Sequence, residues 1–476
     1  MLLPRALPPH AAALWYFPRM PLRRCLAAFV VCAAMAWAGT ALAQDSNYWS
    51  SAYGTRAQLL GGVVTGSSGD ISSVYYNPGA LALAPGAEFL LAGYAVQYQR
   101  VSVANGSGPR RDLVSSVFST VPSLIAGELP VLDHDRLAYS YLSRQQVDLD
   151  IEKRVTTDAA SSSPLPNATF AAFDVQYHQN VGESWYSLTW AHKLSSALGF
   201  GVTPSFVYRS QRTAGSLLAM GENANGQAVL QYSRDFEYSH YRLLARLGLN
   251  GVRDSLTYGI TLNTPGLGLT GGGAYRQSVS LTDQTGTVGN VLGASFQEDL
   301  KAEYKSPLGV AGGISFGRGR MRLHASAEWW AAVDKYNVLE GQPFVIRVPI
   351  RAGNPTGDST VTAIVSEKLD EVFNFGFGLE HHFSPDVAGY ASYHTDRSAR
   401  APDSAPDASV TAWDLNHVTA GVTFNAWRSN FAVGVSTAFG DRPILGLGSR
   451  PDRIPPAELK SSALIVTGTL GWKFTF

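Results

Sequence analysis

Histidine, serine and cysteine are the residues of this sequence that could support catalysis or bind a metal ion. His381 and His382 are adjacent, and His394 lies further along the chain. Adjacent residues on a strand point to opposite faces, so the two neighbouring histidines cannot easily chelate one ion together. No motif singles out a serine nucleophile beside a base. The sequence therefore predicts no metal site, no catalytic residue and no cofactor.

Phosphate and nucleic-acid chemistry are equally poorly supported. The glycine-rich stretch GLGLTGGG, residues 266–273, is followed by neither a strand-to-helix unit nor a Lys-Ser/Thr pair, as a phosphate-binding loop would require. The 37 basic residues are balanced by 37 acidic ones, without a basic run or a zinc-ligand spacing. We therefore expect no nucleic-acid partner.

The first 43 residues have the pattern of a signal peptide. Arg19, Arg23 and Arg24 form a positive region, CLAAFVVCAAMAWAG forms an apolar core, and Ala-Leu-Ala precedes Gln44. A transmembrane anchor is the alternative, but the apolar core is short and ends in Gly-Thr. We expect cleavage after Ala43.

Both cysteines of the chain, Cys25 and Cys32, lie within this expected signal peptide. The chain from residue 44 onward then has neither a disulfide framework nor a thiolate site. This suits a bacterial envelope protein that crosses the periplasm unfolded. No apolar run reaches 18 residues, so the sequence predicts no membrane-spanning helix.

Alternation of apolar and polar residues is the main structural signal. In VFNFGFGLEHHF, apolar side chains at Phe373, Phe375 and Phe377 alternate with Asn374, Gly376 and Gly378, and Glu380 continues the polar series. Such a period of two predicts a strand with one apolar face. The polar faces hold Arg, Glu and His, which suits a watery lumen, whereas the apolar faces suit lipid. A membrane β-barrel is favoured over a β-sandwich or a solenoid.

The turns give the number of strands. Short polar breaks fall near residues 130–134, 194–197, 250–254, 317–319, 384–387 and 426–430. Longer breaks, rich in Gly, Pro and Ser, fall near residues 102–114, 156–168, 211–232, 265–297, 341–361, 397–412 and 441–461. Alternating short and long connections predict an all-β transmembrane barrel of 14 antiparallel strands, with short turns on the periplasmic side.

Residues 44–86 do not alternate. The segment is too small to build a core alone, and its leucines and valines would be poorly placed in a solvated tail. It contains SSVYYNPGALAL, in which Asn77-Pro78 is a turn initiator and Gly79 follows. We expect a small, partly helical plug in the lumen over residues 44–86, before a barrel over residues 87–476.

The stretch YGTRAQLLGGVVTGSSGDISSVYYNPGAL resembles the hatch of FadL-type outer-membrane transporters, which take up long-chain fatty acids and hydrocarbons such as toluene. Their hatch carries an Asn-Pro-Ala motif just ahead of the first strand, so Asn77, Pro78 and Gly79 match it with Gly in place of Ala. That exchange is expected to loosen the turn. The resemblance extends over the whole chain from residue 44 onward.

The resemblance implies a route for the substrate. Hydrophobic substrate is caught in an apolar groove between outer loops three and four, passes a hatch-gated pocket, and leaves sideways beside a kinked third strand. The position of that kink is not evident from the sequence. The residues expected to form the groove are Leu217, Leu218, Met220, Leu267, Leu269, Val291, Leu292 and Phe296. Packing of the loops against each other is the alternative for these residues.

A substrate carboxylate would need a cation in a partly dry pocket. The family resemblance points to Arg209 and Arg212, with Lys335 as a weaker candidate. Solvation of the lumen or contacts with lipid phosphates are the alternatives, and a neutral hydrocarbon would need no cation.

The resemblance also implies a monomer in the outer membrane of a Gram-negative bacterium, surrounded by outer-membrane lipid and lipopolysaccharide. The terminal Phe476 resembles the signal read by the barrel-assembly machinery. An outer-membrane lipid hydrolase, a general diffusion porin and a structural or assembly role remain alternatives to hydrophobic-compound uptake.

Overall fold

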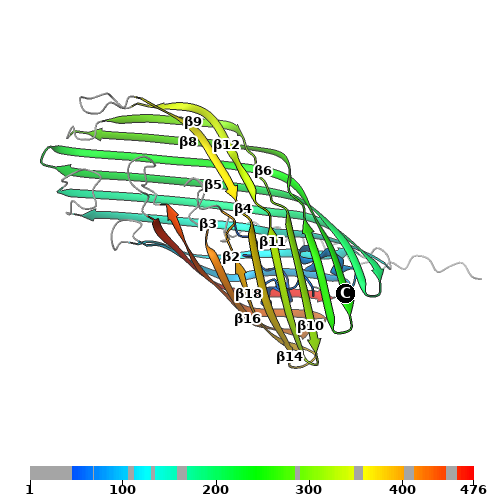
Figure 1. Cartoon of the computed structure of the whole chain (residues 1–476). Coiled ribbons are helices and arrows are strands. Elements are labelled where there is room, and N and C mark those ends of the chain that lie inside the picture. Colours follow the sequence, from blue (N-terminus) through cyan, green and yellow to red (C-terminus); the bar gives the residue numbers. More distant parts are fainter. Residues whose placement is uncertain are drawn as a thin grey trace, which may run out of the picture. The chain divides into compact units, whose positions relative to one another are not determined.

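The computed structural model describes residues 46–67, 69–104, 112–129, 134–157, 169–284, 290–347, 358–400, 412–445 and 458–475. These residues form mostly antiparallel strands, and a few short helices lie near the N-terminal end (Figure 1). The expected signal peptide, residues 1–43, and the terminal Phe476 lie outside the described residues.

Fourteen of the described strands close into a ring, because β5 pairs with β6 as well as with β4. This confirms the predicted 14-stranded antiparallel barrel. The strands of the ring are β1 (Glu88–Val103), β2 (Leu113–Leu129), β3 (Asp135–Thr157), β4 (Phe170–Ser195), β5 (Leu198–Asn223), β6 (Gly226–Arg253), β7 (Leu256–Asn263), β10 (Gly309–Arg318), β11 (Met321–Trp330), β14 (Val372–His382), β15 (Val387–Asp396), β16 (Asp414–Ala426), β17 (Ser429–Leu445) and β18 (Glu458–Thr475).

The alternation of the sequence sets which side chains face the lumen. On β14, Phe373 and Phe377 are 60% and 58% exposed, whereas Asn374 and Glu380 are buried. The barrel is therefore apolar outside and polar inside, the reverse of a water-soluble domain. One residue in two is exposed because successive strand residues point to opposite faces.

Four further strands lie outside the ring. They are β8 (Leu267–Asp283), β9 (Val291–Lys301), β12 (Val333–Ile346) and β13 (Ser359–Leu369). The N-terminal part of β6 pairs with β8 and its C-terminal part with β7. Strand β8 pairs in turn with β9, which lies beside it in Figure 1. Strands β12 and β13 form a separate hairpin.

Several of the predicted long breaks are wrong. Residues 211–232 belong to β5 and β6, which pair continuously up to Asn223 and Gly226. Most of residues 265–297 lies in β8 and β9. Gly, Ser and Asn made these stretches resemble loops, but long strands tolerate such residues when each neighbour supplies a complete hydrogen-bond ladder. The five short turns within the described residues are confirmed.

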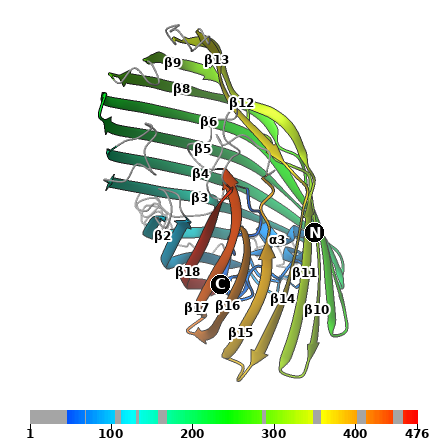
Figure 2. The ribbon, with the colours of Figure 1, turned by 60° about the vertical axis from the view of Figure 1, so that its left-hand side comes forward.

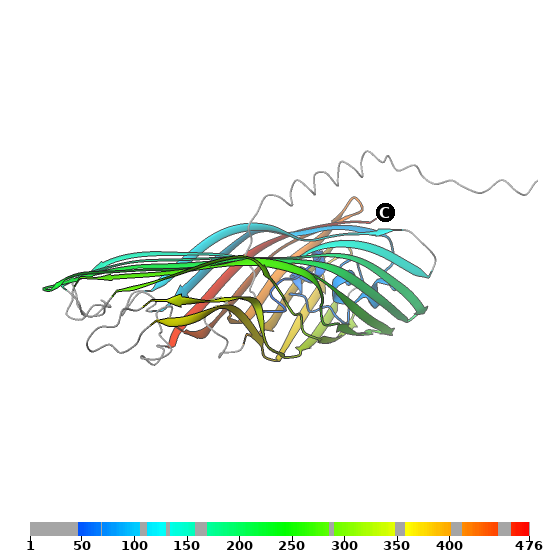
Figure 3. The same cartoon turned by 90° about the horizontal axis from the view of Figure 1, so that it is seen from above.

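Residues 46–86 form a plug inside the ring. Helix α4 (Pro78–Leu81) packs on β4, β5 and β6, whereas α2 (Thr55–Leu59) packs on β15 to β18, on the opposite arc. A segment that contacts both arcs lies within the ring, and Figures 2 and 3 show it, with α3 (Ser73–Tyr76), between the strands. None of the helices that the structure describes has the length and apolarity to cross a membrane.

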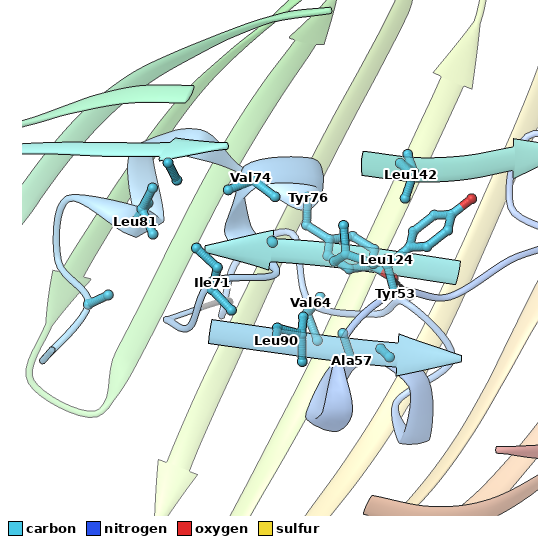
Figure 4. Close-up of a cluster of buried hydrophobic side chains, with 14 of the residues drawn as sticks. Tyr53, Ala57, Val64, Ile71, Val74, Tyr76, Leu81, Leu90, Leu124 and Leu142 are labelled. Atoms are coloured by element: carbon cyan, nitrogen blue, oxygen red, sulfur yellow. Dashed lines mark hydrogen bonds between the residues drawn. The ribbon is translucent and has the colours of Figure 1, made fainter. Parts of the chain in front are cut away.

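The apolar side chains of the plug are buried against the wall. Leu59, Leu60, Ile71 and Leu81 are completely buried in one cluster, which also includes side chains of β1 to β6. Figure 4 shows Ile71 and Leu81 of the plug together with Leu90, Leu124 and Leu142 of the wall. Burying a leucine side chain contributes about 1.5–3 kcal/mol, so this cluster gives the small plug the core that it could not build alone. Packing against the wall thus explains why these apolar side chains of the plug are not exposed to solvent.

Candidate functional site

The Asn-Pro-Gly motif fastens the plug to the wall. Asn77 is the N-cap of α4, and its side-chain oxygen accepts a hydrogen bond from the backbone N–H of Gly79 at 3.1 Å. Its side-chain amide donates to the carbonyl oxygens of Thr65, in the plug, and Leu249, on β6. Pro78 occupies the first helical position, where it needs no backbone donor. One buried asparagine therefore connects three segments.

Gly79 allows α4 to approach the wall closely. A Cβ atom at this position would lie 2.6 Å from the carbonyl oxygens of both Gly199 and Gly248. Such contacts are too short for carbon and oxygen, so an alanine would force the helix or the strands apart. The structure therefore gives Gly79 a packing role, in contrast to the expected loosening of the turn.

The wall itself is interrupted beside the plug. Strand β3 pairs with β4 throughout, but its register shifts between Ser143 and Gln145, leaving Arg144 as an extra residue. Within the described residues, β2 pairs with β3 only between Leu124↔Leu142 and Leu129↔Leu137. The two strands therefore part immediately above the bulge. The irregularity of the third strand therefore lies at Arg144, a position that could not be identified from the sequence.

The plug contacts this bulge directly. Arg144 donates a 2.6 Å hydrogen bond from Nη2 to the backbone oxygen of Tyr48. The Tyr53 hydroxyl lies 3.4 Å from the carbonyl oxygens of Ser143 and Arg144. The plug is therefore in direct contact with the place where β2 and β3 separate.

A cavity lies between the bulge, the plug and β6. Its volume is about 40 Å³, and its lining includes Tyr48, Arg144, Glu183, Arg242 and Lys305. This volume accommodates one or two water molecules or a small polar group. Arg144 and Arg242 are both buried, and the Nη1 atom of each makes no hydrogen bond with the described residues. Two buried guanidinium groups therefore present unused donors at one cavity.

The cavity has an excess of positive charge. Glu183 is the one acidic side chain in its described lining, and its Oε2 lies 2.7 Å from Arg242 and 3.4 Å from Arg209. Lys305 is about half exposed and pairs with Glu303 at 3.5 Å, so Arg144 is the buried cation of the lining that makes no ion pair within the described residues. Buried charge that is not balanced favours an anionic ligand.

Tyr48 and Tyr304 form the aromatic part of the cavity. Tyr48 stacks on Trp330 with ring centroids 4.4 Å apart, and Arg242 lies 5.0 Å from the centroid of the Tyr304 ring. Burial raises the pKa of the Tyr48 hydroxyl far above its ordinary value, so this group stays neutral. The cavity thus combines apolar ring faces with cationic donors, as an amphiphilic acid would need.

A second polar contact holds the other end of the plug. Arg56 donates to Oε2 of Glu380 on β14, with Nη2 at 2.8 Å and Nε at 3.0 Å. Burial alone would lower the pKa of Arg56, but the attraction of Glu380 outweighs it and raises the pKa. Arg56 therefore stays charged, and the ion pair ties α2 to the wall.

The residues suggested for carboxylate binding are not brought together. Arg209 is completely buried and donates to Gln145, Gln211 and Tyr238, besides its ion pair with Glu183. Arg212 faces the opposite side of β5, is half exposed and pairs with Asp235 at 3.1 Å. Lys335 lies exposed on β12. Only Arg209 lies in the lumen beside the cavity, where it holds Glu183.

The residues suggested for the groove lie on strands rather than in loops. Leu218 on β5 pairs with Gln231 on β6, and Gln231 pairs with Ser280 on β8. Ser280 pairs in turn with Leu292 on β9. Directly paired residues share one face, so Leu218 and Leu292 lie on the same side of the sheet. Met220, Leu292 and Phe296 are exposed there. Leu217 and Val291 have the opposite parity, whereas Leu267 and Leu269 lie at the far end of β8.

Arg144 and Arg242 were not singled out from the sequence. Arg242 was recognisable as a polar residue of an alternating strand, and such arginines face the lumen. Arg144 follows the point at which the third strand becomes polar and shares the inward parity of Leu142, but the bulge, after which Gln145 also faces inward, has no clear sequence signal. Their proximity is a property of the closed ring.

The sequence matches no family model and no curated protein. Solved structures, however, are similar. The chain resembles a Pseudomonas aeruginosa FadL homologue, with a TM-score of 0.54 and 10% identity over 90% of this chain and 100% of that one. It also resembles the Pseudomonas putida toluene transporter TodX, with a TM-score of 0.55 and 14% identity over 89% and 99%.

The Ralstonia pickettii toluene transporter TbuX gives a similar result, with a TM-score of 0.54 and 11% identity over 89% of this chain and 98% of that one. At such identities the likeness concerns the fold. The similarity nevertheless covers nearly the full length of each protein. The chain therefore has the fold of the FadL-type outer-membrane proteins.

Proposed function

We propose that this chain is an outer-membrane protein that takes up hydrophobic compounds bearing a carboxylate, such as long-chain fatty acids. The observation that carries the proposal is the pair of buried arginines, Arg144 and Arg242, whose Nη1 atoms lack hydrogen-bond partners among the described residues at one cavity. Hydrogen bonds to charged groups contribute about 1.5–3 kcal/mol, so a carboxylate would relieve the cost of two unsatisfied donors.

The location in the outer membrane is supported by the surface of the barrel. Apolar side chains such as Phe377, Leu470 and Ile260 are more than half exposed around the ring. A surface of this kind is stable when lipid covers it. The solved structures with this fold include a FadL homologue and two toluene transporters, which supports transport rather than catalysis.

The exit is proposed to be sideways, between β2 and β3. Support comes from the loss of pairing between these strands above Leu124 and Leu142 and from the bulge at Arg144. A hydrocarbon chain gains free energy by passing directly from an apolar route into lipid, at about 0.8 kcal/mol per buried CH₂. An exit through water would forfeit that gain.

The plug is proposed to act as the gate. The cavity of about 40 Å³ receives a head group but has no room for a long chain. Binding of a whole fatty acid then requires the plug to move, and Tyr48 and Tyr53 connect the plug to the bulge at the proposed exit. The apolar residues Leu218, Met220, Leu292 and Phe296 are proposed to collect substrate on the outer face of the sheet.

Deletion of the gene tests this proposal directly. The deletion strain should take up radiolabelled long-chain fatty acid more slowly than the parent, and re-expression should restore the rate. Mass spectrometry of the protein purified in mild detergent should find a bound carboxylic acid. Equal uptake by both strains would contradict the transport proposal. Slower uptake of neutral alkanes alone would contradict only the proposal that the substrate bears a carboxylate.

A further inference from the structure

The interface between α2 and strands β15 to β18 has two cavities, one on either side of Leu59. The upper cavity has a volume of about 40 Å³ and is lined by Gln58, His394, Thr419 and Thr469, among others. The lower cavity has a volume of about 640 Å³. Its lining includes the turn residues Asp386, Trp427 and Arg428, so it opens at the end of the barrel that carries the short turns.

The separation between the cavities follows one strand. On β16, Thr419 lines the upper cavity and Thr423 the lower one, and Gly421 lies between them with the same inward parity. A Cβ atom at Gly421 would lie 2.6 Å from Cδ2 of Leu59. Gly434 on β17 is paired with Gly421, and a Cβ atom there would overlap the same Leu59 atom. A pair of glycines thus forms a seat for a single leucine side chain.

The seat lies between the residues of β16 that line the two cavities. Leu59 is completely buried, and Thr55, one helical turn earlier, packs against Gly471 on β18. Residues at positions i and i+4 of a helix lie on the same face, so Leu59 and the methyl group of Thr55 form one narrow apolar ridge of α2 that packs against the wall. The linings above and below this ridge combine apolar side chains with polar ones such as Gln58, Thr419 and Thr423.

The upper cavity is built for a polar occupant. Gln58 Oε1, His394 Nδ1 and Thr469 Oγ1 are buried and make no hydrogen bond within the described part of the chain. Each such atom costs about 1–3 kcal/mol when it is left dry. A few water molecules would satisfy them, and a cavity of this volume has room for one or two.

We propose that the interface between the plug and strands β15 to β18 is a polar passage for water and small hydrophilic solutes, and that the Leu59 side chain closes it. The passage lies on the arc opposite α4, apart from the separation between β2 and β3. It is therefore independent of the route proposed for hydrophobic compounds. Truncating Leu59 removes the ridge and joins the two cavities.

Two matched threonines test the closure. Thr469 lines the upper cavity and Thr423 the lower, and both are buried. Each is replaced singly by cysteine, with both native cysteines, Cys25 and Cys32, absent from the processed protein or replaced by serine. The rate of reaction with a small cationic methanethiosulfonate is then measured on folded protein in detergent, with and without Leu59→Ala.

With Leu59 present, T423C is expected to react at least tenfold faster than T469C. In the L59A background, T469C should accelerate at least tenfold while T423C changes little. Leu60→Ala is the control, because Leu60 is equally buried but packs against Gly378 on β14. It should leave T469C slow.

Three results would overturn the proposal. They are fast labelling of T469C with Leu59 in place, no acceleration in L59A, or equal acceleration in L60A, which would indicate general loosening of the plug. Heat-modifiable migration on gels establishes that each variant is folded. If L59A does not fold, Leu59→Val provides a milder truncation, for which an intermediate acceleration is expected.

Discussion

The side-chain amide of Asn77 donates a 3.0 Å hydrogen bond to the carbonyl oxygen of Leu249, which joins the plug to strand β6 of the wall. The same amide donates to Thr65 within the plug, and the side-chain oxygen caps α4. A single residue thus determines where α4 begins and where it sits in the ring. Substitution of Asn77 should therefore affect the plug without altering the strand pairing of the barrel.

Replacing Asn77 and Pro78 by alanine should impair uptake while the barrel stays heat-stable. Loss of the cap costs about 1 kcal/mol, and the two carbonyl oxygens lose their buried donor. The strands of the ring keep their ladders. Uptake assays and heat-modifiable gel migration measure the two effects, and unchanged uptake would remove the gating role of the motif.

Gly79→Ala should displace α4 from the wall. The added Cβ atom would meet two backbone carbonyl oxygens at 2.6 Å, and overpacking of this kind costs about 1–3 kcal/mol. Limited proteolysis of the plug should become faster. Gly86→Ala is the control, because its Cβ atom would meet only a methyl group of Thr475 at 3.6 Å. Equal proteolysis of both variants would refute the close-packing role.

Arg144→Gln and Arg242→Gln should weaken the binding of fatty acids selectively. Each removes a charged donor from the cavity, so affinity should fall roughly 10- to 100-fold, in line with about 1.5–3 kcal/mol per hydrogen bond. Binding of a neutral alkane should change little. Arg212→Gln, on the outward face, is the matched control. Fluorescence competition with both ligand types measures the difference, and equal losses for acid and alkane would argue against a carboxylate site.

Deleting Arg144 should slow the uptake of acids and alkanes alike. The deletion leaves the pairing of Ser143 with Ser184 and of Gln145 with Glu183 intact and removes the bulge between them. Strand β3 can then pair with β2 over a greater length and close the gap. Arg144→Gln keeps the bulge but loses the charged donor. Comparison of the two variants therefore distinguishes an effect on the exit from an effect on head-group binding. Normal alkane uptake by the deletion variant would place the exit elsewhere.

Glu380→Gln should destabilise the plug more than an exposed counterpart. The change leaves Arg56 without its charged partner inside the ring, at a cost of about 1–3 kcal/mol after allowance for the partial exposure of Arg56. Glu152→Gln, whose pair with Arg154 is exposed, should change stability by less than about 0.5 kcal/mol. Urea unfolding in detergent measures both. Equal effects would show that the Arg56 pair contributes no more than a surface one.

The alternation of the sequence was sufficient for the fold class. Strands such as β14 expose Phe373 and Phe377 and bury Asn374, as the period of two requires, since a one-residue shift would turn every side chain to the other face. The short turns were also recognisable. The long strands β5 and β6 were not, because Gly215, Ser216 and Asn223 resemble loop residues until the neighbouring strands supply their hydrogen bonds.

The candidate site was only partly predictable. The Asn-Pro-Gly motif was evident, and the structure supplies its contacts with Leu249 and with Gly199 and Gly248. Among the suggested cations, only Arg209 lies beside the cavity, and its donors are already engaged. Residues remote in sequence meet there, so local pattern could not identify them.

The sequence by itself determined the barrel class, the short turns and the polarity of the strand faces, because these depend on neighbouring residues along one segment. The tertiary structure decided which side chains converge. Closing the ring brings Arg144 of β3 to Arg242 of β6, and the extra residue in β3 lies beside the separation of β2 from β3. Ring closure and strand register depend on residues far apart in the sequence, and they determine which functional side chains lie together.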